Sequence, residues 1–369
     1  MNLVKNMNLD SHRCQWHRER IEQWLSGVRV APITIDMALS KACNYSCVYC
    51  YSKLQRNDHR VLTKKVIFNF LDDCAEAGVK AISIVSDGES SMNPNLYDFI
   101  QHGKENGIDM GLGTNGYLLK TDKLADILPC LTYLRFNTSA TGDRYKEVHG
   151  SPEGAFQTVC ETIEDCVKIK KAYDLPLTIG LQMVLLPEYI DEVEPLIQLG
   201  KHLGVDYVVI KHCSDNEKGD LGVDYSQYER LTDRLRQAEK LSDREMAVVI
   251  KWSKILTGSK RRYRQCYATA LMLQMSGNGL VAPCGSFFAK EYEKYHIGNI
   301  IDMRFRDILT SDRYWEVMWE LRSQRFDARS MCATLCLQDK VNEFIYDLQQ
   351  GVVTFQEPRG AKPDGVNFL

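Results

Sequence analysis

Residues 34–50 read Thr-Ile-Asp-Met-Ala-Leu-Ser-Lys-Ala-Cys-Asn-Tyr-Ser-Cys-Val-Tyr-Cys, and this stretch decides the fold. Its first part, with Ile33, predicts a β-strand over 33–39, and Cys43, Cys47 and Cys50 follow that strand in the pattern CxxxCxxC. Cysteine thiolates are the usual ligands of iron–sulfur clusters, and four of them close a four-iron cluster. Three thiolates therefore leave one iron open to a small molecule.

A zinc knuckle is the alternative interpretation of these three cysteines. A structural zinc site needs four ligands, commonly arranged as two close pairs. The nearest candidate for a fourth ligand is His59, nine residues beyond Cys50. We therefore favour a cluster held by three cysteines.

The spacing of the cysteines, with the aromatic Tyr49 before the last of them, resembles the signature of the radical S-adenosylmethionine (SAM) enzymes. In that family the open iron of a [4Fe–4S] cluster binds the amino and carboxylate groups of SAM. One electron from the cluster then splits SAM into methionine and a 5′-deoxyadenosyl radical. The resemblance implies that the chain binds both cofactors and that a reducing partner such as flavodoxin or ferredoxin supplies the electron.

Short apolar segments alternate with amphipathic helices from residue 33 to about residue 250. Strands are predicted at 33–39, 81–85, 109–113, 133–137, 178–186 and 207–211. Helices are predicted between and after them at 64–77, 95–106, 120–128, 155–173, 190–203 and 225–241. This alternation predicts an α/β fold, a partial (β/α)6 TIM-like barrel, with the active site at the carboxyl ends of parallel strands.

Four segments are expected along the chain. An amino-terminal helical extension occupies 1–32, with a helix at 14–28, and the barrel occupies 33–250. A smaller α+β domain follows at 251–349, and an irregular tail rich in Pro and Gly ends the chain at 350–369. Within the smaller domain, Asn278-Gly279 between apolar runs predicts a hairpin. Helices are expected at about 313–323 and 339–349.

Four further cysteines lie in the smaller domain. Cys266 and Cys284 bracket the predicted hairpin, and Cys332 and Cys336 are spaced so that a helical turn would place both thiols on one face. Four thiolates close an iron–sulfur cluster, and they serve zinc equally well. The residues alone therefore leave the metal undecided.

Cys266, Gly279 and Cys284, in this order, resemble the opening motif of the SPASM and twitch subgroups of radical SAM proteins. Full SPASM proteins carry seven cysteines and two auxiliary clusters there, whereas a later cysteine pair completes a single cluster in twitch proteins. Four cysteines beyond residue 260 resemble the twitch form and imply one auxiliary [4Fe–4S] cluster. The final CxxxC departs from the CxxC that is common in that subgroup.

The turn after the second strand reads Ser86-Asp87-Gly88-Glu89-Ser90, where radical SAM enzymes usually have Gly-Gly-Glu-Pro. Glu89 matches the acidic residue of that motif, and a carboxylate suits the ammonium group of SAM. Ser86, Asp87 and Ser90 depart from it. The resemblance implies that SAM is bound by Tyr49, Ser86, Glu89, Asn115, Asn137, Ser139 and Gln182. Tyr49 could equally pack in the core, and each of the polar side chains could cap a strand end or a turn.

A closed auxiliary cluster beside a radical site offers an electron acceptor. In the twitch subgroup it is linked to two-electron oxidation, and the nearest known function is the dehydrogenation of 2-deoxy-scyllo-inosamine, an aminocyclitol. We therefore expect an oxidoreductase that oxidises a small polar metabolite such as a sugar or cyclitol. A radical epimerase, a peptide-modifying maturase, an electron carrier and a zinc-binding interaction protein are the alternatives.

Candidate catalytic residues follow the sixth predicted strand. Cys213 is placed to return a hydrogen atom in an epimerase, and His212 or Asp215 would accept the proton of an alcohol. Lys211, like Arg135 and Arg144, would suit a phosphate or carboxylate. The alternative is a buried apolar role for Cys213 and surface salt bridges at strand ends for the others.

The 369 residues carry a net charge of −3 with a pI near 6.3, which argues against a nucleic-acid partner. We interpret the basic run at 260–264 as a solvated loop. The sequence contains no apolar stretch of the length that a signal peptide or a membrane span requires. The thirteen cysteines are therefore expected as reduced thiols in the cytoplasm, and no membrane partner is expected.

Overall fold

The computed structural model describes residues 9, 12–256, 260–334, 336–358 and 360–369. Its strands form one sheet in the order β10-β9-β8-β1-β2-β3-β4-β5-β6-β7. The strands are β1 (Thr34–Met37), β2 (Ala81–Ile84), β3 (Asp109–Thr114), β4 (Leu131–Asn137), β5 (Thr178–Leu185), β6 (Tyr207–His212), β7 (Ala247–Ile250), β8 (Met272–Met275), β9 (Leu280–Ala282) and β10 (Gly298–Asn299). Strands β1 to β7 are all parallel, which confirms the predicted α/β open barrel.

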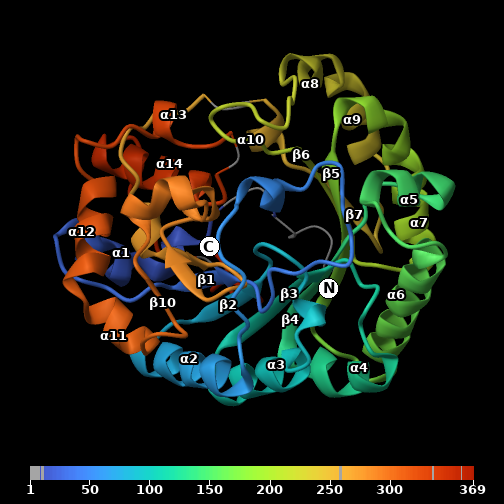
Figure 1. Cartoon of the computed structure of the whole chain (residues 1–369). Coiled ribbons are helices and arrows are strands. Elements are labelled where there is room, and N and C mark those ends of the chain that lie inside the picture. Colours follow the sequence, from blue (N-terminus) through green and yellow to red (C-terminus); the bar gives the residue numbers. More distant parts are fainter. Residues whose placement is uncertain (1–8, 10–11, 257–259, 335, 359) are drawn as a thin grey trace.

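Helices cover the outside of this sheet (Figure 1). The barrel helices are α2 (Lys64–Ala77), α3 (Leu96–Glu105), α4 (Thr121–Ile127), α5 (Gly142–His149), α6 (Ala155–Ala172), α7 (Val193–Leu203), α8 (Ser226–Arg230) and α9 (Thr232–Glu239). The others are α1 (Arg18–Leu25), α10 (Trp252–Ile255), α11 (Phe305–Thr310), α12 (Asp312–Leu321), α13 (Ala328–Met331) and α14 (Asp339–Gln349). Helix α2 illustrates how the sequence forms these amphipathic helices. Its buried face carries Ile67, Phe70, Leu71 and Cys74, and Gly78 ends the helix in the left-handed conformation.

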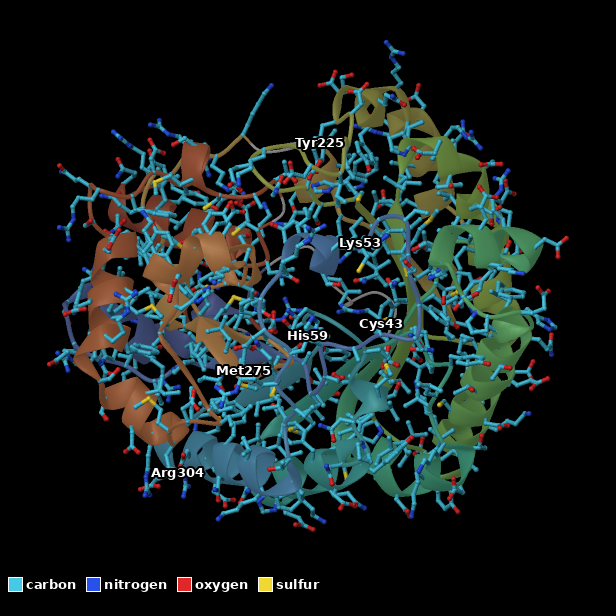
Figure 2. The ribbon with its side chains drawn as sticks, in the orientation of Figure 1. Cys43, Lys53, His59, Tyr225, Met275 and Arg304 are labelled. Carbon is cyan, nitrogen blue, oxygen red and sulfur yellow. The ribbon has the colours of Figure 1, made fainter. Side chains whose placement is uncertain are left out.

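The predicted hairpin is confirmed, and it joins the barrel. Strands β8 and β9 are antiparallel, and β8 pairs in parallel with β1, with Thr34 opposite Met272. Helix α11 packs against α2, where Arg304 forms two hydrogen bonds of 2.9 and 2.6 Å with the buried carboxylate of Asp73 (Figure 2). The carboxyl-terminal region therefore extends the barrel sheet on the β1 side.

The amino ends of the strands are filled with side chains. A Cβ at Gly111 would lie 2.2 Å from the ring of Tyr133, and one at Gly180 would lie 2.3 Å from the ring of Tyr207, so both rings occupy the barrel interior over glycines. The end of the chain covers the same side, since Thr34 Oγ1 donates to the carbonyl of Asn367 at 2.6 Å. The amino ends of the strands are therefore closed to ligands, which leaves the carboxyl ends as the side where a ligand can bind.

Some elements were not predicted from the sequence. These are β7, α5, α10, α11, α13 and β10. Of the predicted amino-terminal extension, residues 1–8, 10 and 11 lie outside the described residues. In the described part of the chain, none of the helices has the length and apolarity that crossing a membrane requires.

Candidate functional site

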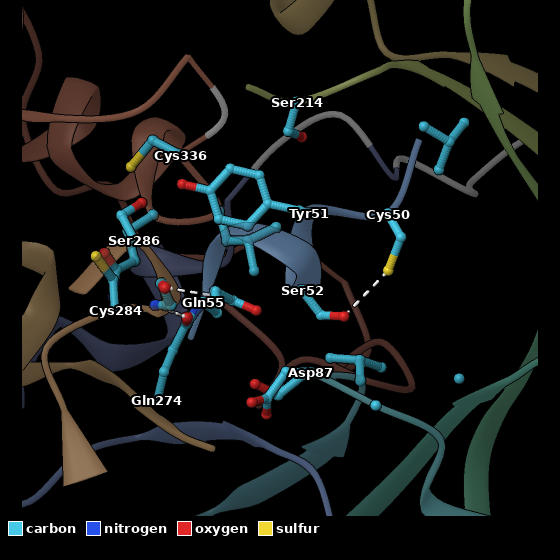
Figure 3. Close-up of a pocket in the computed structure, with 18 of the residues that line it drawn as sticks. Cys50, Tyr51, Ser52, Gln55, Asp87, Ser214, Gln274, Cys284, Ser286 and Cys336 are labelled. Carbon is cyan, nitrogen blue, oxygen red and sulfur yellow. Dashed lines mark hydrogen bonds between the residues drawn. The ribbon is translucent and has the colours of Figure 1, made fainter. Parts of the chain in front are cut away.

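A cavity of about 320 Å³ opens at the carboxyl ends of the barrel strands and reaches the β8–β9 hairpin (Figure 3). Its lining includes every cysteine that was predicted to bind a cluster: Cys43, Cys47, Cys50, Cys266, Cys284, Cys332 and Cys336. The other six cysteines of the chain do not line it. The fold thus brings the two predicted thiol groups, which are more than 200 residues apart in sequence, to one space.

The loop that carries the first three cysteines is tied to the end of α5. The amides of Ser46 and Val48 donate to the carbonyls of His149 and Val148 at 3.1 and 3.0 Å. A Cβ at Gly150 would lie 2.8 Å from the carbonyl oxygen of Ser46, so glycine permits this close approach. Two backbone hydrogen bonds therefore fix the loop on the barrel.

The His149 side chain supports the same loop. It is fully buried, and its Nε2 accepts a hydrogen bond from the amide of Ser139 at 2.9 Å. The proton of the neutral ring therefore sits on Nδ1, which lies 3.5 Å from Cys47 Sγ and 3.2 Å from the hydroxyl of Tyr49. Burial lowers the pKa of His149 to about 3, so the ring stays neutral at physiological pH. Sequence reasoning missed this residue, because no spacing relates it to Cys47.

Glu89 is held as a buried carboxylate at the edge of the cavity. It is 4% exposed and accepts hydrogen bonds from Thr114 Oγ1 at 2.8 Å, from the amide of Asn115 at 2.8 Å and from the amide of Ser91 at 3.0 Å. Asn115 also donates to Asn44 in the cysteine loop at 2.9 Å. A fixed negative charge beside the thiols suits an ammonium group, which is what binding of SAM requires.

The polar residues predicted at the ends of β4 and β5 divide into two kinds. Asn137 and Gln182 line the cavity, where Asn137 donates to the Tyr49 hydroxyl at 2.8 Å and Gln182 donates to Asn137 at 3.3 Å. Ser139 does not line the cavity, because its hydroxyl accepts from the amide of Val184 at 3.0 Å and so joins the two strands. Tyr49 and Ser86 do line the cavity.

Asp87 explains one departure from the family motif. Its carboxylate accepts hydrogen bonds from Ser276 Oγ at 2.6 Å and from the amide of Gly277 at 2.8 Å, in the turn of the β8–β9 hairpin. It is 3% exposed, and burial raises its pKa, opposed by these hydrogen bonds and by Lys41. The turn that carries Glu89 is therefore bonded directly to the carboxyl-terminal region.

The helical turn predicted for Cys332 and Cys336 is wrong. Helix α13 ends at Met331, and Cys332 has extended backbone angles, φ −106° and ψ 148°. The reason is a tertiary contact: the amide of Thr334 donates to the carbonyl of Asp215 at 3.0 Å, and the amide of Asp215 donates to Thr334 Oγ1 at 2.8 Å. This contact draws the segment away from helical geometry, yet both thiols still border the cavity.

The interpretation of 260–264 as a solvated loop is wrong for Arg261. Its side chain is 3% exposed and donates to the carbonyls of Ala328 and Ala333 at 3.1 and 2.5 Å, on either side of Cys332. Arg262, the next residue, lies at the surface and pairs with Asp347 at 2.9 Å. Arg261 therefore holds the cysteine segment and places a positive charge beside its thiols.

The thiols suit a metal cluster. Burial raises the pKa of Cys43 and Cys266 to about 11 and that of Cys47 and Cys284 to about 12, so bound iron would supply the charge that favours the thiolates. In the described part of the chain, no three His, Cys, Asp or Glu side chains converge closely enough to hold a single metal ion. The thiols instead border a shared space, as the ligands of a four-iron cluster do.

The four predicted catalytic residues lie at the end of β6 and just beyond it, and they do not all face the cavity. Lys211 lines the cavity, whereas His212, Cys213 and Asp215 do not. The Asp215 carboxylate accepts the amides of Asn216, Leu221 and Val223 at 2.8 to 3.3 Å and so shapes its own loop. Cys213 borders a second cavity of about 250 Å³.

His59 was the candidate for a fourth zinc ligand. His59 is exposed and does not line the main cavity (Figure 2).

Tyr51, which sequence reasoning did not select, follows Cys50 directly, and its ring lies in the cavity near Ser286 and Cys284 (Figure 3). Burial raises the pKa of Tyr51, opposed by its hydrogen bond with Ser286. Adjacency to a motif cysteine was the signal that could have identified it.

Residues 37–200 match the radical SAM superfamily, and residues 266–337 match the SPASM iron–sulfur cluster-binding domain. The chain therefore contains a radical SAM domain followed by an SPASM domain. It is a radical SAM enzyme, which binds SAM with a [4Fe–4S] cluster, and its SPASM domain binds auxiliary iron–sulfur clusters.

Three known proteins illustrate the similarity. The AdoMet-dependent heme synthase of Methanosarcina barkeri is 26% identical over 75% of this chain and 82% of its own length. The tungsten-containing aldehyde ferredoxin oxidoreductase cofactor-modifying protein of Pyrococcus furiosus is 21% identical over 75% of this chain and 81% of its own. The structure of Streptococcus suis SuiB bound to S-adenosylmethionine has the same fold, with a TM-score of 0.62, 14% identity and coverage of 82% of this chain and 72% of SuiB.

Proposed function

We propose that this radical SAM enzyme oxidises a small polar metabolite, such as a sugar or cyclitol, and that its auxiliary cluster accepts an electron from the substrate. The observation that supports this most strongly is the single cavity lined by both thiol groups. When bound, SAM and its cluster supply a 5′-deoxyadenosyl radical that removes a hydrogen atom from a C–H bond. A substrate in this cavity would then lie within reach of both cofactors.

The chain's own residues would bind and orient the reactants. Glu89 and Asn115 would hold the amino group of SAM, while Asn137, Gln182 and Tyr49 would contact its other polar groups. Lys211 would face the substrate. A role for His212 or Asp215 in accepting the alcohol proton has less support, because neither lines the cavity and Asp215 already accepts three amides.

Modification of a larger cofactor is the second candidate. The names of the Methanosarcina barkeri and Pyrococcus furiosus relatives describe synthesis of a cofactor or action on one, and each aligns with 75% of this chain. The epimerase alternative has weaker support, because Cys213 borders the second cavity rather than the main one. A peptide maturase remains an alternative of the same fold. We further propose that the enzyme works in the cytoplasm with a flavodoxin or ferredoxin as electron donor.

The first test is iron and sulfide per chain after anaerobic reconstitution. We expect about eight irons in the wild type and about four in a variant with Cys43, Cys47 and Cys50 changed to Ala. About four irons falling to none, with zinc present, would contradict an auxiliary electron acceptor and favour a redox-neutral reaction.

The second test follows SAM cleavage. The reconstituted wild type with dithionite should release 5′-deoxyadenosine, and a panel of sugars and aminocyclitols should show one compound oxidised in equal amount to the 5′-deoxyadenosine formed. Changing Cys284 to Ala should leave SAM cleavage in place but abolish the oxidised product. A wild type that cleaves no SAM would contradict the enzymatic function.

A further inference from the structure

Two cations line the same wall of the cavity. Arg135 lies in β4 and Lys211 in β6, and both side chains are half-buried. In the described part of the chain, neither has an ion pair. The guanidinium of Arg135 lies 5.5 Å from the centre of the Tyr133 ring. Half-buried cations that have no ion-pair partner favour the binding of an anion.

Glycines lie on both sides of Arg135 in the sheet. In the sheet register Arg135 is opposite Gly113 of β3 and Gly180 of β5. The ring of Tyr207 fills the space over Gly180, and a Cβ at Gly113 would lie 3.7 Å from Nη2 of Arg135 and 2.9 Å from Val85 Cγ1. The two residues opposite Arg135 therefore offer its guanidinium no charged or hydrogen-bonding side chain, and Arg135 lines the cavity.

The acidic groups of the cavity do not neutralise this pair. Asp87 and Glu89 line the β2 side, and each already accepts hydrogen bonds there. Asp36 lies in β1, deeper in the barrel, and does not line the cavity. Burial raises the pKa of Asp36 to about 6, opposed by Arg135 and Ser83, but the two do not form an ion pair. One side of the cavity is therefore anionic and the other cationic.

Lys211 shows that positive charge is in excess on this wall. Burial, with repulsion from Arg135, Lys251 and Lys254, lowers its pKa to about 7, and Cys213 opposes this shift. A bound anion would reverse that shift, because an opposite charge favours the protonated amine.

We propose that Arg135 and Lys211 form a subsite that binds an anionic group of the substrate, a phosphate or a carboxylate. This inference rests on the proposed function, since it assigns the substrate class to the same cavity. A neutral sugar or cyclitol would leave both cations unpaired, so the geometry favours a phosphorylated or carboxylated metabolite. Arg offers a forked pair of donors to such a group, and Lys adds a point charge.

The test uses the reconstituted holoenzyme with SAM bound. Inorganic phosphate and, separately, acetate are titrated while the thermal unfolding midpoint is followed anaerobically. We expect a saturable rise in the wild type with at least one of the two anions, and at least about tenfold weaker binding in Arg135→Gln and in Lys211→Gln. A saturable rise with phosphate only, or with acetate only, identifies whether the anionic group is a phosphate or a carboxylate. Arg135→Lys, which keeps the charge, should retain part of the binding.

Arg18→Gln is the matched control. Arg18 lies at the surface on α1, where it pairs with Glu22 at 2.9 Å, and its change should leave anion binding as in the wild type. No saturable rise in the wild type, or equal binding in all variants whose iron content is intact, would overturn the proposal.

A separate measurement tests whether the carboxylate of SAM is itself the anion that Arg135 and Lys211 bind. The carboxylate of SAM is the other anion that enters this cavity, so equilibrium dialysis with labelled SAM is run on the same variants. We expect unchanged SAM affinity. A tenfold loss of SAM affinity in Arg135→Gln and Lys211→Gln would overturn the proposal and assign the pair to SAM. Release of 5′-deoxyadenosine by the wild type tests the proposed function independently of either result.

Discussion

The two thiol groups of the cavity are built in different ways. Cys43, Cys47 and Cys50 come from one loop of eight residues, which two backbone hydrogen bonds fix to α5. The second group, Cys266, Cys284, Cys332 and Cys336, comes from three separate segments. Its geometry depends on Arg261 and on the contact between Asp215 and Thr334. A site within one loop carries its own geometry, whereas an assembled site depends on residues that belong to no motif.

Removing Arg261 should break the assembled site alone. In Arg261→Met the carbonyls of Ala328 and Ala333 lose their donor, so the segment that carries Cys332 and Cys336 is no longer fixed. Iron per chain should fall from about eight to about four, measured after anaerobic reconstitution. Arg262→Met changes the neighbouring surface cation and should keep all the iron. Full iron content in Arg261→Met would show that the cysteines alone define the site.

Removing Asp87 should affect both regions, because its carboxylate joins them. Asp87→Ala leaves Ser276 Oγ and the amide of Gly277 without an acceptor, which should lower the free energy of unfolding by about 2–3 kcal/mol. SAM affinity should fall by about tenfold, since Glu89 lies two residues further on. Guanidinium unfolding and dialysis with labelled SAM measure the two effects.

Asp98→Ala is the control for that variant. Asp98 pairs with Lys64 at the surface, and its change should alter the free energy of unfolding by less than about 0.5 kcal/mol. Unchanged SAM affinity in Asp87→Ala would mean that the hairpin turn stabilises the fold without affecting the SAM site.

The barrel strands could be predicted because short apolar segments in alternation with helices carry their own signal. The six predicted strands were found within about two residues of their expected ends. Helix α5 was missed, because it is short, polar and inserted in a crossover that already had a helix, α6. The cysteines were visible as a motif, whereas His149 and Arg261 were not, since only tertiary packing brings them to the thiols.

Replacing His149 should alter the loop site without emptying it. A hydrogen bond to a ligand sulfur favours the reduced, more negative cluster, so His149→Leu should make the midpoint potential of the first cluster more negative. About 30–60 mV is expected, which corresponds to about 1 kcal/mol for one electron. Spectroscopic redox titration in a Cys266→Ala background isolates this cluster.

The control for that variant is another histidine. His102 on α3 pairs with Asp72 at the surface, so His102→Leu should leave the potential unchanged. If His149→Leu kept its full iron content and an unchanged potential, His149 would serve only to pack the loop and would not tune the cluster.

Replacing Lys211 should have the smallest effect, on stability and with a defined pH dependence. Its pKa is about 7 in the fold and about 10.5 in the unfolded chain, because burial disfavours the charge. Between about pH 7 and pH 10.5 the unfolded chain therefore binds one proton more than the folded protein at this residue. The free energy of unfolding of the wild type consequently rises as the pH rises through this range. Lys211→Met should be the more stable protein at about pH 6.5, and this advantage should shrink by about pH 9.5.

Thermal unfolding of anaerobic wild type and variant at several pH values measures this difference. The matched change Lys64→Met, at a surface pair, should show no such trend. A constant difference across the pH range would mean that Lys211 keeps its proton in the folded protein.

The parallel pairing of β1 with β8 has a consequence for synthesis of the protein. The first strand leaves the ribosome more than 200 residues before the partner that covers its outer edge. Until then that edge presents unpaired amides and carbonyls, which favour association with other chains. The nascent barrel should therefore depend on chaperones late in translation. Deleting the carboxyl-terminal region should yield aggregates rather than a smaller working barrel.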